Sequence, residues 1–419
     1  MSLLRTGRIA AAYLGARLDD ATPQDRPALS ARQDRLWRRL APALARTPAL
    51  AALAGRPLDA FPVREAAEIR VDLEAWNSLG LAATQILEAA QAAEEGRHTA
   101  LPDGTQAGFS TGSEGVRGVF LTTPAERDHY LGTLLGRLVA PARLLRPIRA
   151  ALILRANNRL YEDVQGAGAA FAFIGLDKDP ATQLELLRGF APTHLVAPPH
   201  VLVALARLIE TGGWTPRLDG LFYGAEPMGE GEGDSLARTF GIAPRPLYQA
   251  TEGFLGAPCR LGTLHLNEEN LVIERDPIAG SNRFRPIVTD LRRRGQPVIR
   301  VRLDDLIEPR SPCPCGSPRL AIQPVEGRIG DVWRRDEALI FPREVDAAVA
   351  VALPLLASWR AEASPSGVRG FVTDGKHQAP VRDALETLLA TRGVRWPVTV
   401  QVASQVDTRP KRRRVRWVA

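Results

Sequence analysis

Two short segments carry residue types that together could hold a nucleoside triphosphate. The first reads Ser-Thr-Gly-Ser-Glu-Gly-Val-Arg-Gly over residues 110–118, and the second reads Tyr-Gln-Ala-Thr-Glu-Gly over residues 248–253. A loop rich in glycine and hydroxyl side chains can wrap backbone N–H groups around phosphate oxygens, because glycine lets the chain approach closely. The aromatic ring, hydroxyl and carboxylate of the second segment could stack on a base, hydrogen-bond to a phosphate and hold Mg²⁺. Taken alone, a segment like the first is more often a turn between a strand and a helix. The presence of the second segment makes a phosphate-binding loop the favoured interpretation of the first.

Together these segments resemble two core motifs of the adenylate-forming enzymes, which join ATP to a carboxylic acid and then usually pass the acyl group to a thiol. Residues 109–120 and the later segments described below are most similar to the phenylacetate-CoA ligase-like branch and its little-characterised bacterial members, and the likeness spans most of the chain. The resemblance implies an α/β fold with a large N-terminal domain of mostly parallel sheets flanked by helices, plus an antiparallel subdomain. A small α+β C-terminal domain would follow.

The first motif implies a cradle for the phosphates of ATP. The residues that match it are Ser110, Thr111, Gly112, Ser113, Gly115 and Arg117. In the wider family a lysine often stands near the end of this loop, and some members of this branch have arginine there. Arg117 keeps the charge of a lysine but changes the geometry of the hydrogen bonds.

The second motif implies a role for each of its polar residues. By resemblance, Tyr248 would stack on the adenine, Thr251 would hydrogen-bond to the α-phosphate and Glu252 would ligate magnesium. The family usually has glycine after the tyrosine, and Gln249 stands there instead. This difference leaves the orientation of the Tyr248 ring open.

Three later segments match the family in chain order. Gly224, Ala225 and Glu226 follow an expected strand and resemble the segment that lays its backbone against the adenine, at the strand ends where open α/β sheets bind nucleotides. Asp305 aligns with the aspartate that binds both ribose hydroxyls, a task that suits the two acceptor oxygens of a carboxylate. Arg328 lies in a segment that resembles the hinge between domains and could reach ribose or phosphate, although an arginine beside glycine is usually part of a solvated turn.

Lys411 lies where the family carries its C-terminal catalytic lysine, in the segment Thr-Arg-Pro-Lys-Arg-Arg-Arg of residues 408–414. That lysine bridges the carboxylate and the α-phosphate during adenylation, and one well-placed cation of this kind can raise a rate by about 10²–10³-fold. The glycine that normally precedes it is Pro410 here, and three arginines follow. The alternative is a basic tail that aids solubility or contacts an acidic partner.

The three cysteines and one histidine form a possible metal-ligand set. They are Cys259, His265, Cys313 and Cys315. Three sulfurs and one imidazole suit tetrahedral zinc, and four protein ligands leave no open position for water, so the expected site is structural. Some members of the phenylacetate-CoA ligase-like branch have similar ligands. The alternative is three buried free thiols and a surface histidine.

Composition narrows the remaining functional classes. A length of 419 residues suits a large domain plus a smaller one. No stretch reaches the roughly 20 apolar residues that a bilayer helix needs. Residues 9–16 are more typical of an amphipathic helix than of a secretion signal. We therefore expect a cytoplasmic protein. The net charge is +7, but residues 407–419 hold six basic residues and one acid. Because the charge is local, nucleic acid is not an expected partner.

The hydrophobic pattern predicts elements that could position these residues. Residues 32–53 and 63–97 read as helices, and from residue 107 the pattern alternates between strands and helices, as in a parallel sheet covered by helices. The expected elements there are strands at 150–154, 193–197 and 220–223 and helices at 181–189 and 200–211. Strands at 263–274, 287–291 and 298–303 follow, the last two joined by a turn at 292–295. Beyond them come helices at 344–353 and 381–391 and a strand at 398–402.

These elements suggest two domains. Residues 1–326 would form the large domain, with a mainly helical lead-in over 1–100 and a strand-rich part over 254–325. Residues 327–419 would form a small mobile domain that pivots near Arg328.

The sequence therefore predicts an ATP- and magnesium-dependent enzyme that activates a small carboxylic acid, of aryl or arylalkyl type by resemblance, and transfers the acyl group to CoA or a carrier-protein phosphopantetheine. Two alternatives stay open: a catalytically weak nucleotide- and zinc-binding interaction protein, and an adenylating enzyme with a non-thiol acceptor. A homodimer is also left open. The histidines at positions 98, 129, 194 and 200 have no assigned role.

Overall fold

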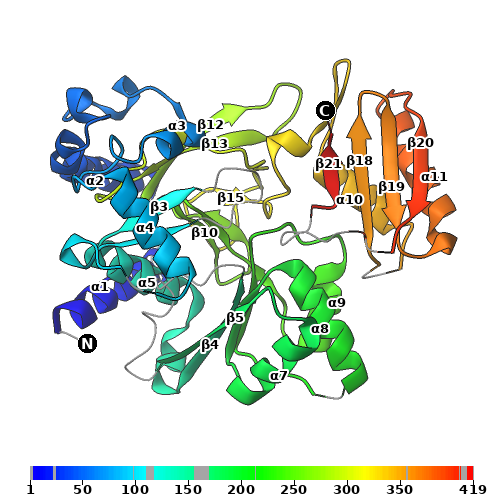
Figure 1. Cartoon of the computed structure of the whole chain (residues 1–419), viewed down its shortest axis with the longest axis horizontal. Coiled ribbons are helices and arrows are strands. Elements are labelled where there is room, and N and C mark those ends of the chain that lie inside the picture. Colours follow the sequence, from blue (N-terminus) through cyan, green and yellow to red (C-terminus); the bar gives the residue numbers. More distant parts are fainter. Residues whose placement is uncertain are drawn as a thin grey trace.

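The computed structural model describes residues 3–21, 25–97, 99–109, 118–154, 169–212, 214–354, 357–404, 406 and 413–418. In Figure 1 the N-terminal helices, in blue, lie at one end of the molecule, and the C-terminal strands and helices, in orange and red, gather at the other. None of the described helices is long and apolar enough to cross a bilayer.

The N-terminal part is helical, as predicted, but more broken than the pattern suggests. Its helices are α1 (Leu3–Ala21), α2 (Arg26–Arg46), α3 (Ala66–Val71) and α4 (Ala83–Glu94). The single helix predicted over 63–97 is wrong, because the buried side chain of Asn77 hydrogen-bonds to backbone groups of Leu73 and Leu81. An asparagine that satisfies the backbone in this way stabilises a non-helical connection.

Helix α5 (Pro124–Leu138), which the sequence pattern did not predict, packs along α1. Gly132 and Gly136 of α5 face the backbone of α1, where an added Cβ would lie only 2.3 Å from the carbonyl oxygen of Ile9 and 2.7 Å from that of Tyr13. Two glycines one turn apart therefore allow the helices to touch through their backbones.

A five-stranded parallel sheet forms the centre of the large body and confirms the predicted alternation. Its strands are β4 (Ile148–Leu154), β5 (Ala169–Gly175), β6 (His194–Ala197), β7 (Gly220–Tyr223) and β8 (Arg245–Pro246), in the order β5-β4-β6-β7-β8. Helices α7 (Pro180–Phe190), α8 (Pro199–Gly212) and α9 (Glu232–Phe240) pack against it through a shared apolar core. The core includes Leu187, Leu195, Leu202 and Leu221, all fully buried.

Two further four-stranded sheets supply the predicted strand-rich part. One has the order β15-β11-β10-β9 and the other the order β1-β14-β13-β12. The strands are β1 (Arg64–Glu65), β9 (Tyr248–Ala250), β10 (Gly253–Pro258), β11 (Leu264–Leu266), β12 (Leu271–Pro277), β13 (Phe284–Asp290), β14 (Val301–Arg302) and β15 (Ala321–Ile322). The strand predicted over 263–274 is two strands, because Asn267 accepts a backbone bond from Asn270 and turns the chain.

The C-terminal part has a sheet and an apolar core of its own. Its elements are β16 (Trp333–Arg335), β17 (Ala338–Ile340), α10 (Pro342–Ala350), β18 (Trp359–Ser364), β19 (Gly367–Val372), α11 (Gln378–Thr391), β20 (Val398–Val402) and β21 (Val415–Trp417). The larger sheet has the order β20-β19-β18-β21. Trp333 and Leu385 are fully buried in its core. The domain boundary at residue 327 stays a prediction.

Candidate active site

One cavity of about 1120 Å³ brings together residues that lie far apart in the sequence. The predicted site residues that line it are Gly224, Ala225, Glu226, Tyr248, Thr251, Glu252, Asp305 and Arg328. The predicted loop residues Ser110, Thr111, Gly112, Ser113, Gly115 and Arg117, and the predicted catalytic Lys411, lie outside the described residues. The loop is bracketed by the hairpin of β2 (Gln106–Phe109) and β3 (Val119–Thr122), and its neighbours Phe109 and Gly118 line the same cavity.

The first wall of the cavity lies at the carboxyl end of β7, where open α/β sheets bind ligands. Ala225 has a φ of +70°, a left-handed conformation that costs an alanine energy. The Glu226 carboxylate beside it is buried and lies 2.8 Å from Nδ1 of His200, on the first turn of α8. The strained residue and the anchored carboxylate fix the path of the backbone along this wall.

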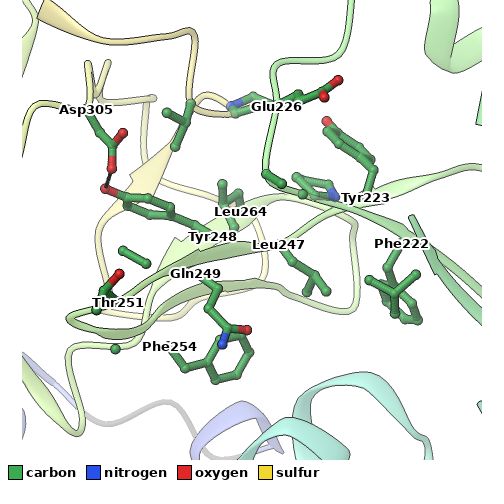
Figure 2. Close-up of a pocket in the computed structure, with 18 of the residues that line it drawn as sticks. Phe222, Tyr223, Glu226, Leu247, Tyr248, Gln249, Thr251, Phe254, Leu264 and Asp305 are labelled. Atoms are coloured by element: carbon green, nitrogen blue, oxygen red, sulfur yellow. Dashed lines mark hydrogen bonds between the residues drawn. The ribbon is translucent and has the colours of Figure 1, made fainter. Parts of the chain in front are cut away.

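Tyr248 and Asp305 form the centre of the site. The Tyr248 hydroxyl donates a hydrogen bond of 2.7 Å to Oδ2 of Asp305, which Figure 2 shows as a direct contact across the pocket. Burial, and then the neighbouring Asp305 carboxylate, raise the pKa of Tyr248 well above its ordinary value. The tyrosine therefore keeps its proton and remains a donor. This bond fixes the ring orientation that Gln249 left open.

Thr251 and Glu252 lie in the turn between β9 and β10. Arg293, which is buried, donates through Nη1 to the carbonyl oxygen of Thr251 at 2.6 Å and through Nη2 to that of Leu121 in β3 at 3.3 Å. It therefore joins this turn to the hairpin that carries the predicted phosphate loop. Burial raises the pKa of Glu252, and Arg293 opposes this shift.

Asp290 adds a second buried carboxyl group to the same cavity. Its Oδ1 accepts the backbone N–H groups of Arg292 at 2.8 Å and Arg293 at 3.2 Å. Burial raises the pKa of Asp290 to about 6, and Arg293 opposes this. Asp290 and Arg293 were missed at the sequence level, where residues 292–295 appeared only as a turn. The one available signal was a charged cluster at the edge of a strand.

Helix α5 provides another wall. The Tyr130 hydroxyl donates to Oε1 of Gln249 at 2.7 Å, and the Tyr130 ring meets Phe254 edge to face at 5.9 Å. Figure 2 shows Gln249 and Phe254 on the opposite side of the strand from the Tyr248 hydroxyl. The glutamine that replaces the family's glycine is therefore held by a partner from α5.

The C-terminal part closes the opposite end of the cavity. Arg414, just before β21, pairs with Glu232 of α9 and with Asp346 of α10, the latter at 3.0 Å. Arg413 pairs with the buried Asp331. The side chains of Arg413 and Arg414 are only 19% and 12% exposed. These two arginines are therefore held in ion pairs, and the pair of Arg414 with Glu232 joins the C-terminal sheet to the large body. The choice between a catalytic Lys411 and a basic tail stays a prediction.

Arg328 lies between the strand-rich sheets and the elements of the C-terminal part. Its backbone pairs with Asp305 in an isolated bridge, and the Ile329 N–H donates to the Asp304 carbonyl at 2.7 Å. Gly327 before it has a φ of +149°, a conformation that only glycine adopts readily. The predicted hinge residue is thus in direct backbone contact with the predicted ribose ligand.

The four predicted zinc ligands also come together, away from the cavity. Their ligand atoms all lie within 4.8 Å of one another. The sulfurs of Cys259 and Cys313 are 3.9 Å apart, and the sulfur of Cys315 is 3.5 Å from Nε2 of His265. Tetrahedral zinc, with Zn–S of about 2.3 Å and Zn–N of about 2.0–2.1 Å, would place two sulfurs about 3.8 Å apart and sulfur and nitrogen about 3.6 Å apart. The donor set and its spacing both fit this metal.

The neighbours of this cluster support the same fit. Nδ1 of His265 contacts the Arg319 carbonyl oxygen at 3.1 Å, so it carries the proton and leaves Nε2 to face the sulfurs. The Leu261 N–H points at the Cys259 sulfur at 3.4 Å. Arg319 in turn pairs with Asp20 of α1, which links the cluster to the N-terminal helix.

No family model and no protein of curated function matches the sequence. Solved structures do match over nearly the whole chain. A 2-hydroxyisobutyryl-CoA ligase in the postadenylation state, in complex with 2-HIB-AMP, has a TM-score of 0.67 and 17% identity, covering 94% of this chain and 90% of that one. The same ligase in an open conformation scores 0.57, and in the thioesterification state 0.58.

Two further structures match a smaller part of the chain. An anthranilate CoA ligase, AuaEII, in complex with anthranoyl-AMP has a TM-score of 0.54 and 10% identity, covering 75% of this chain and 68% of its own. The amide bond synthetase McbA from Marinactinospora thermotolerans has a TM-score of 0.51 and 16% identity, covering 75% of this chain and 69% of its own. With the parallel sheet, the antiparallel sheets and the C-terminal unit in place, this chain has the fold of the adenylate-forming enzymes.

Proposed function

We propose that this protein activates a carboxylic acid with ATP, releasing pyrophosphate, and then transfers the acyl group from the adenylate to a thiol. The observation that carries the proposal is the meeting of Glu252, Tyr248 and Asp305 in one cavity, beside the ends of the predicted phosphate loop. The solved structures of this fold that hold 2-HIB-AMP and anthranoyl-AMP support it. CoA or a carrier-protein phosphopantetheine would supply the thiol.

In the first half-reaction an oxygen of the substrate carboxylate forms a bond to the α-phosphorus, and the bond from that phosphorus to pyrophosphate breaks. Residues 110–117 would hold the phosphates, and Thr251 would contact the α-phosphate. Lys411 would stabilise the charge that builds on phosphorus. It precedes Arg413, which lines the cavity, by two residues, and this supports its place in the mechanism.

Magnesium fits the Glu252 position. The Glu252 carboxyl is partly buried and lines the cavity, and among the described residues no cationic side chain lies within ion-pair distance of it. A hard divalent cation would compensate the charge of such a carboxylate. Bound there, magnesium would neutralise the phosphates of ATP.

Other residues would bind the nucleotide. Asp305 would hold the ribose hydroxyls while Tyr248 fixes the Asp305 carboxylate, and Arg328 would contact ribose or phosphate. Gly224, Ala225 and Glu226 would present backbone to the adenine. The strained wall at Ala225 and the 2.7 Å bond between Tyr248 and Asp305 support these roles, because both hold their groups in place before a ligand arrives.

We also propose that Cys259, His265, Cys313 and Cys315 hold a structural zinc ion. The match between their spacing and tetrahedral coordination supports it. Four protein ligands leave no position for a substrate, so the ion would stabilise the strand-rich part rather than take part in the reaction.

The acid would be of aryl or arylalkyl type, as the resemblance to the phenylacetate-CoA ligase-like branch implies. The aromatic residues Tyr130, Phe222 and Phe254 in the cavity wall support this class. A non-thiol acceptor is the second candidate, because an amide bond synthetase shares the fold. Product analysis with CoA, carrier protein and amines distinguishes the two.

Pyrophosphate release across a library of carboxylic acids tests the proposal. We expect at least one acid to trigger release, and Asp305→Ala to raise the KM for ATP. Tight ATP binding with no release for any acid would instead favour a nucleotide-binding interaction protein.

A further inference from the structure

Among the residues that line the cavity, several polar side chains come from α5 and from the turns at residues 267–270 and 290–293. We call this part of the cavity the α5 compartment. The residues of this compartment that line the cavity are Glu126, His129, Thr133, Asn267, Asn270, Asp290 and Arg292. No predicted role in ATP binding uses these side chains.

Arg292 is the cation of this compartment. Its Nε donates to Oδ1 of Asn270 at 3.0 Å, and among the residues that the structure describes no carboxylate forms an ion pair with it. The acids Asp290 and Glu126, which also line the cavity, bind backbone of the turn: Asp290 accepts the N–H groups of Arg292 and Arg293, and Glu126 accepts those of Arg294 and Gly295.

Other arginines lie near Arg292 and add positive charge around it. Burial, and then the nearby Arg32, lower the pKa of Arg292 to about 10, with smaller effects from Arg39 and Arg294. Asp290 acts in the opposite direction. A half-buried guanidinium among other guanidiniums favours the arrival of an anion, because the anion relieves both burial and repulsion.

Buried polar atoms without partners point to the same place. Nε2 of His129 and Oδ1 of Asn267 have no hydrogen-bond partner in the described structure. Burial lowers the pKa of His129 to about 4, with a further contribution from Arg292. The histidine is therefore neutral near pH 7, and its lone pair, like the amide oxygen, lacks the bond that buried polar atoms normally make. A water molecule or a hydroxyl group of the ligand, each of which can donate, would supply it, whereas an anionic group would bind through Arg292.

We propose that this compartment binds a second anionic group on the substrate acid, such as a distal carboxylate, through Arg292. The proposal rests on the proposed function and narrows its substrate to acids that carry an anion at the end away from the reacting carboxylate. The planar guanidinium can make two parallel hydrogen bonds to such a group. The neighbouring Tyr130 and Phe254 would contact the part of the acid between its two ends.

Matched pairs of acids test this inference: an arylalkyl monocarboxylic acid, and the same skeleton with a second carboxylate at its far end. We expect the wild-type protein to release pyrophosphate with a higher kcat/KM for the diacid. Arg292→Gln should lower that value by about 10- to 100-fold through KM, with the KM for ATP and the kcat/KM for the monoacid unchanged. Arg294→Gln removes an equal charge from an exposed neighbour and should change each value less than twofold.

Equal kcat/KM for both acids in the wild-type protein, or an equal loss for both in Arg292→Gln, would overturn the inference. Arg292→Lys provides a second variant if Arg292→Gln does not fold, because it keeps the charge but loses the paired hydrogen bonds; it should recover only part of the diacid preference.

A binding measurement separates this inference from the proposed function. If no acid releases pyrophosphate, the proposed function fails. The compartment is then tested by the diacid alone, which should raise the thermal midpoint of the wild-type protein but not of Arg292→Gln. No rise in the wild-type protein would overturn the compartment as well.

Discussion

At the scale of single residues, the bond between Tyr248 and Asp305 decides how the predicted ribose ligand is held. Asp305 offers two oxygens, and the tyrosine hydroxyl occupies one of them at 2.7 Å. A carboxylate fixed in this way does not need to be ordered when a nucleotide binds. The pair therefore links a predicted adenine contact to a predicted ribose contact.

Tyr248→Phe tests this link. The change keeps the ring but removes the hydroxyl, so we expect the KM for ATP to rise about tenfold while the KM for the acid stays constant. Steady-state pyrophosphate release measures both. Tyr130→Phe is the matched control, because its hydroxyl binds Gln249 and its loss should alter the KM for the acid rather than for ATP. If Tyr248→Phe instead changed the KM for the acid and Tyr130→Phe changed the KM for ATP, the two assignments would be exchanged.

Asp290 makes stability depend on pH. Its pKa is about 6 in the folded protein and 3.8 as an ordinary aspartate. Between these values the folded state binds more protons than the unfolded state, so stability falls as the pH rises from about 4 to about 6. The loss from this group alone is up to about 3 kcal/mol. Above this window the contribution stays lost.

Urea unfolding from pH 4 to pH 7 measures how steeply the free energy of unfolding falls with pH. Asp290→Asn should flatten it, whereas Asp383→Asn, at an exposed position on α11, should leave it intact. A wild-type slope that survives Asp290→Asn would assign the proton uptake to another group.

Residue types and spacing indicated Tyr248, Glu252 and Asp305 as candidates because each stands in a short motif with a recognisable order, and the structure brings the three into one cavity. Arg293 and Tyr130 could not be found in this way. Arg293 acts through backbone oxygens of Leu121 and Thr251, and any residue type can offer those. A contact of this kind leaves no pattern in the sequence.

At the scale of elements, the parallel sheet was predictable and the helix beside it was not. The strands alternate with helices at regular intervals, and β7 was placed at residues 220–223, as observed. Helix α5 was missed because its buried face includes Gly132, Thr133 and Gly136, which do not produce an apolar repeat. On this face of α5, close backbone contact with α1 takes the place of the large apolar side chains that usually mark a buried helix face.

The proposed zinc site should control the stability of the strand-rich part. Structural zinc contributes on the order of 10 kcal/mol to the folding of small domains, so Cys315→Ser should release metal and lower the thermal midpoint. Metal analysis of the purified protein and a thermal melt measure the two effects. Leu261→Ala, at a half-exposed position beside Cys259, is the control and should retain metal. An unchanged melt in Cys315→Ser would indicate plain thiols.

At the scale of the whole molecule, Arg414 connects the two parts. It contacts Glu232 in α9 and Asp346 in α10, and the Glu230 N–H also donates to Asp346 at 2.8 Å. The bonds from Arg414 to Glu232 and from the Glu230 N–H to Asp346 hold the C-terminal part against the large body. The general fold was predictable from motif order, but this arrangement was not, because it depends on ion pairs between segments about 180 residues apart.

Arg414→Ala should shift the balance between the two half-reactions. Without the ion pair to Glu232 the C-terminal part leaves this arrangement more easily, so we expect pyrophosphate exchange to fall severalfold while transfer from a supplied acyl-adenylate to CoA is maintained. Arg369→Ala removes an equal charge from an exposed position on β19 and should affect neither rate. A parallel loss of both rates would indicate general damage rather than a changed balance.

The chain of contacts from Asp20 through Arg319 to His265 has a practical consequence for anyone who produces this protein. Helix α1 and the four-ligand cluster share one anchor, so shortening the N-terminus beyond residue 20 should cost metal affinity.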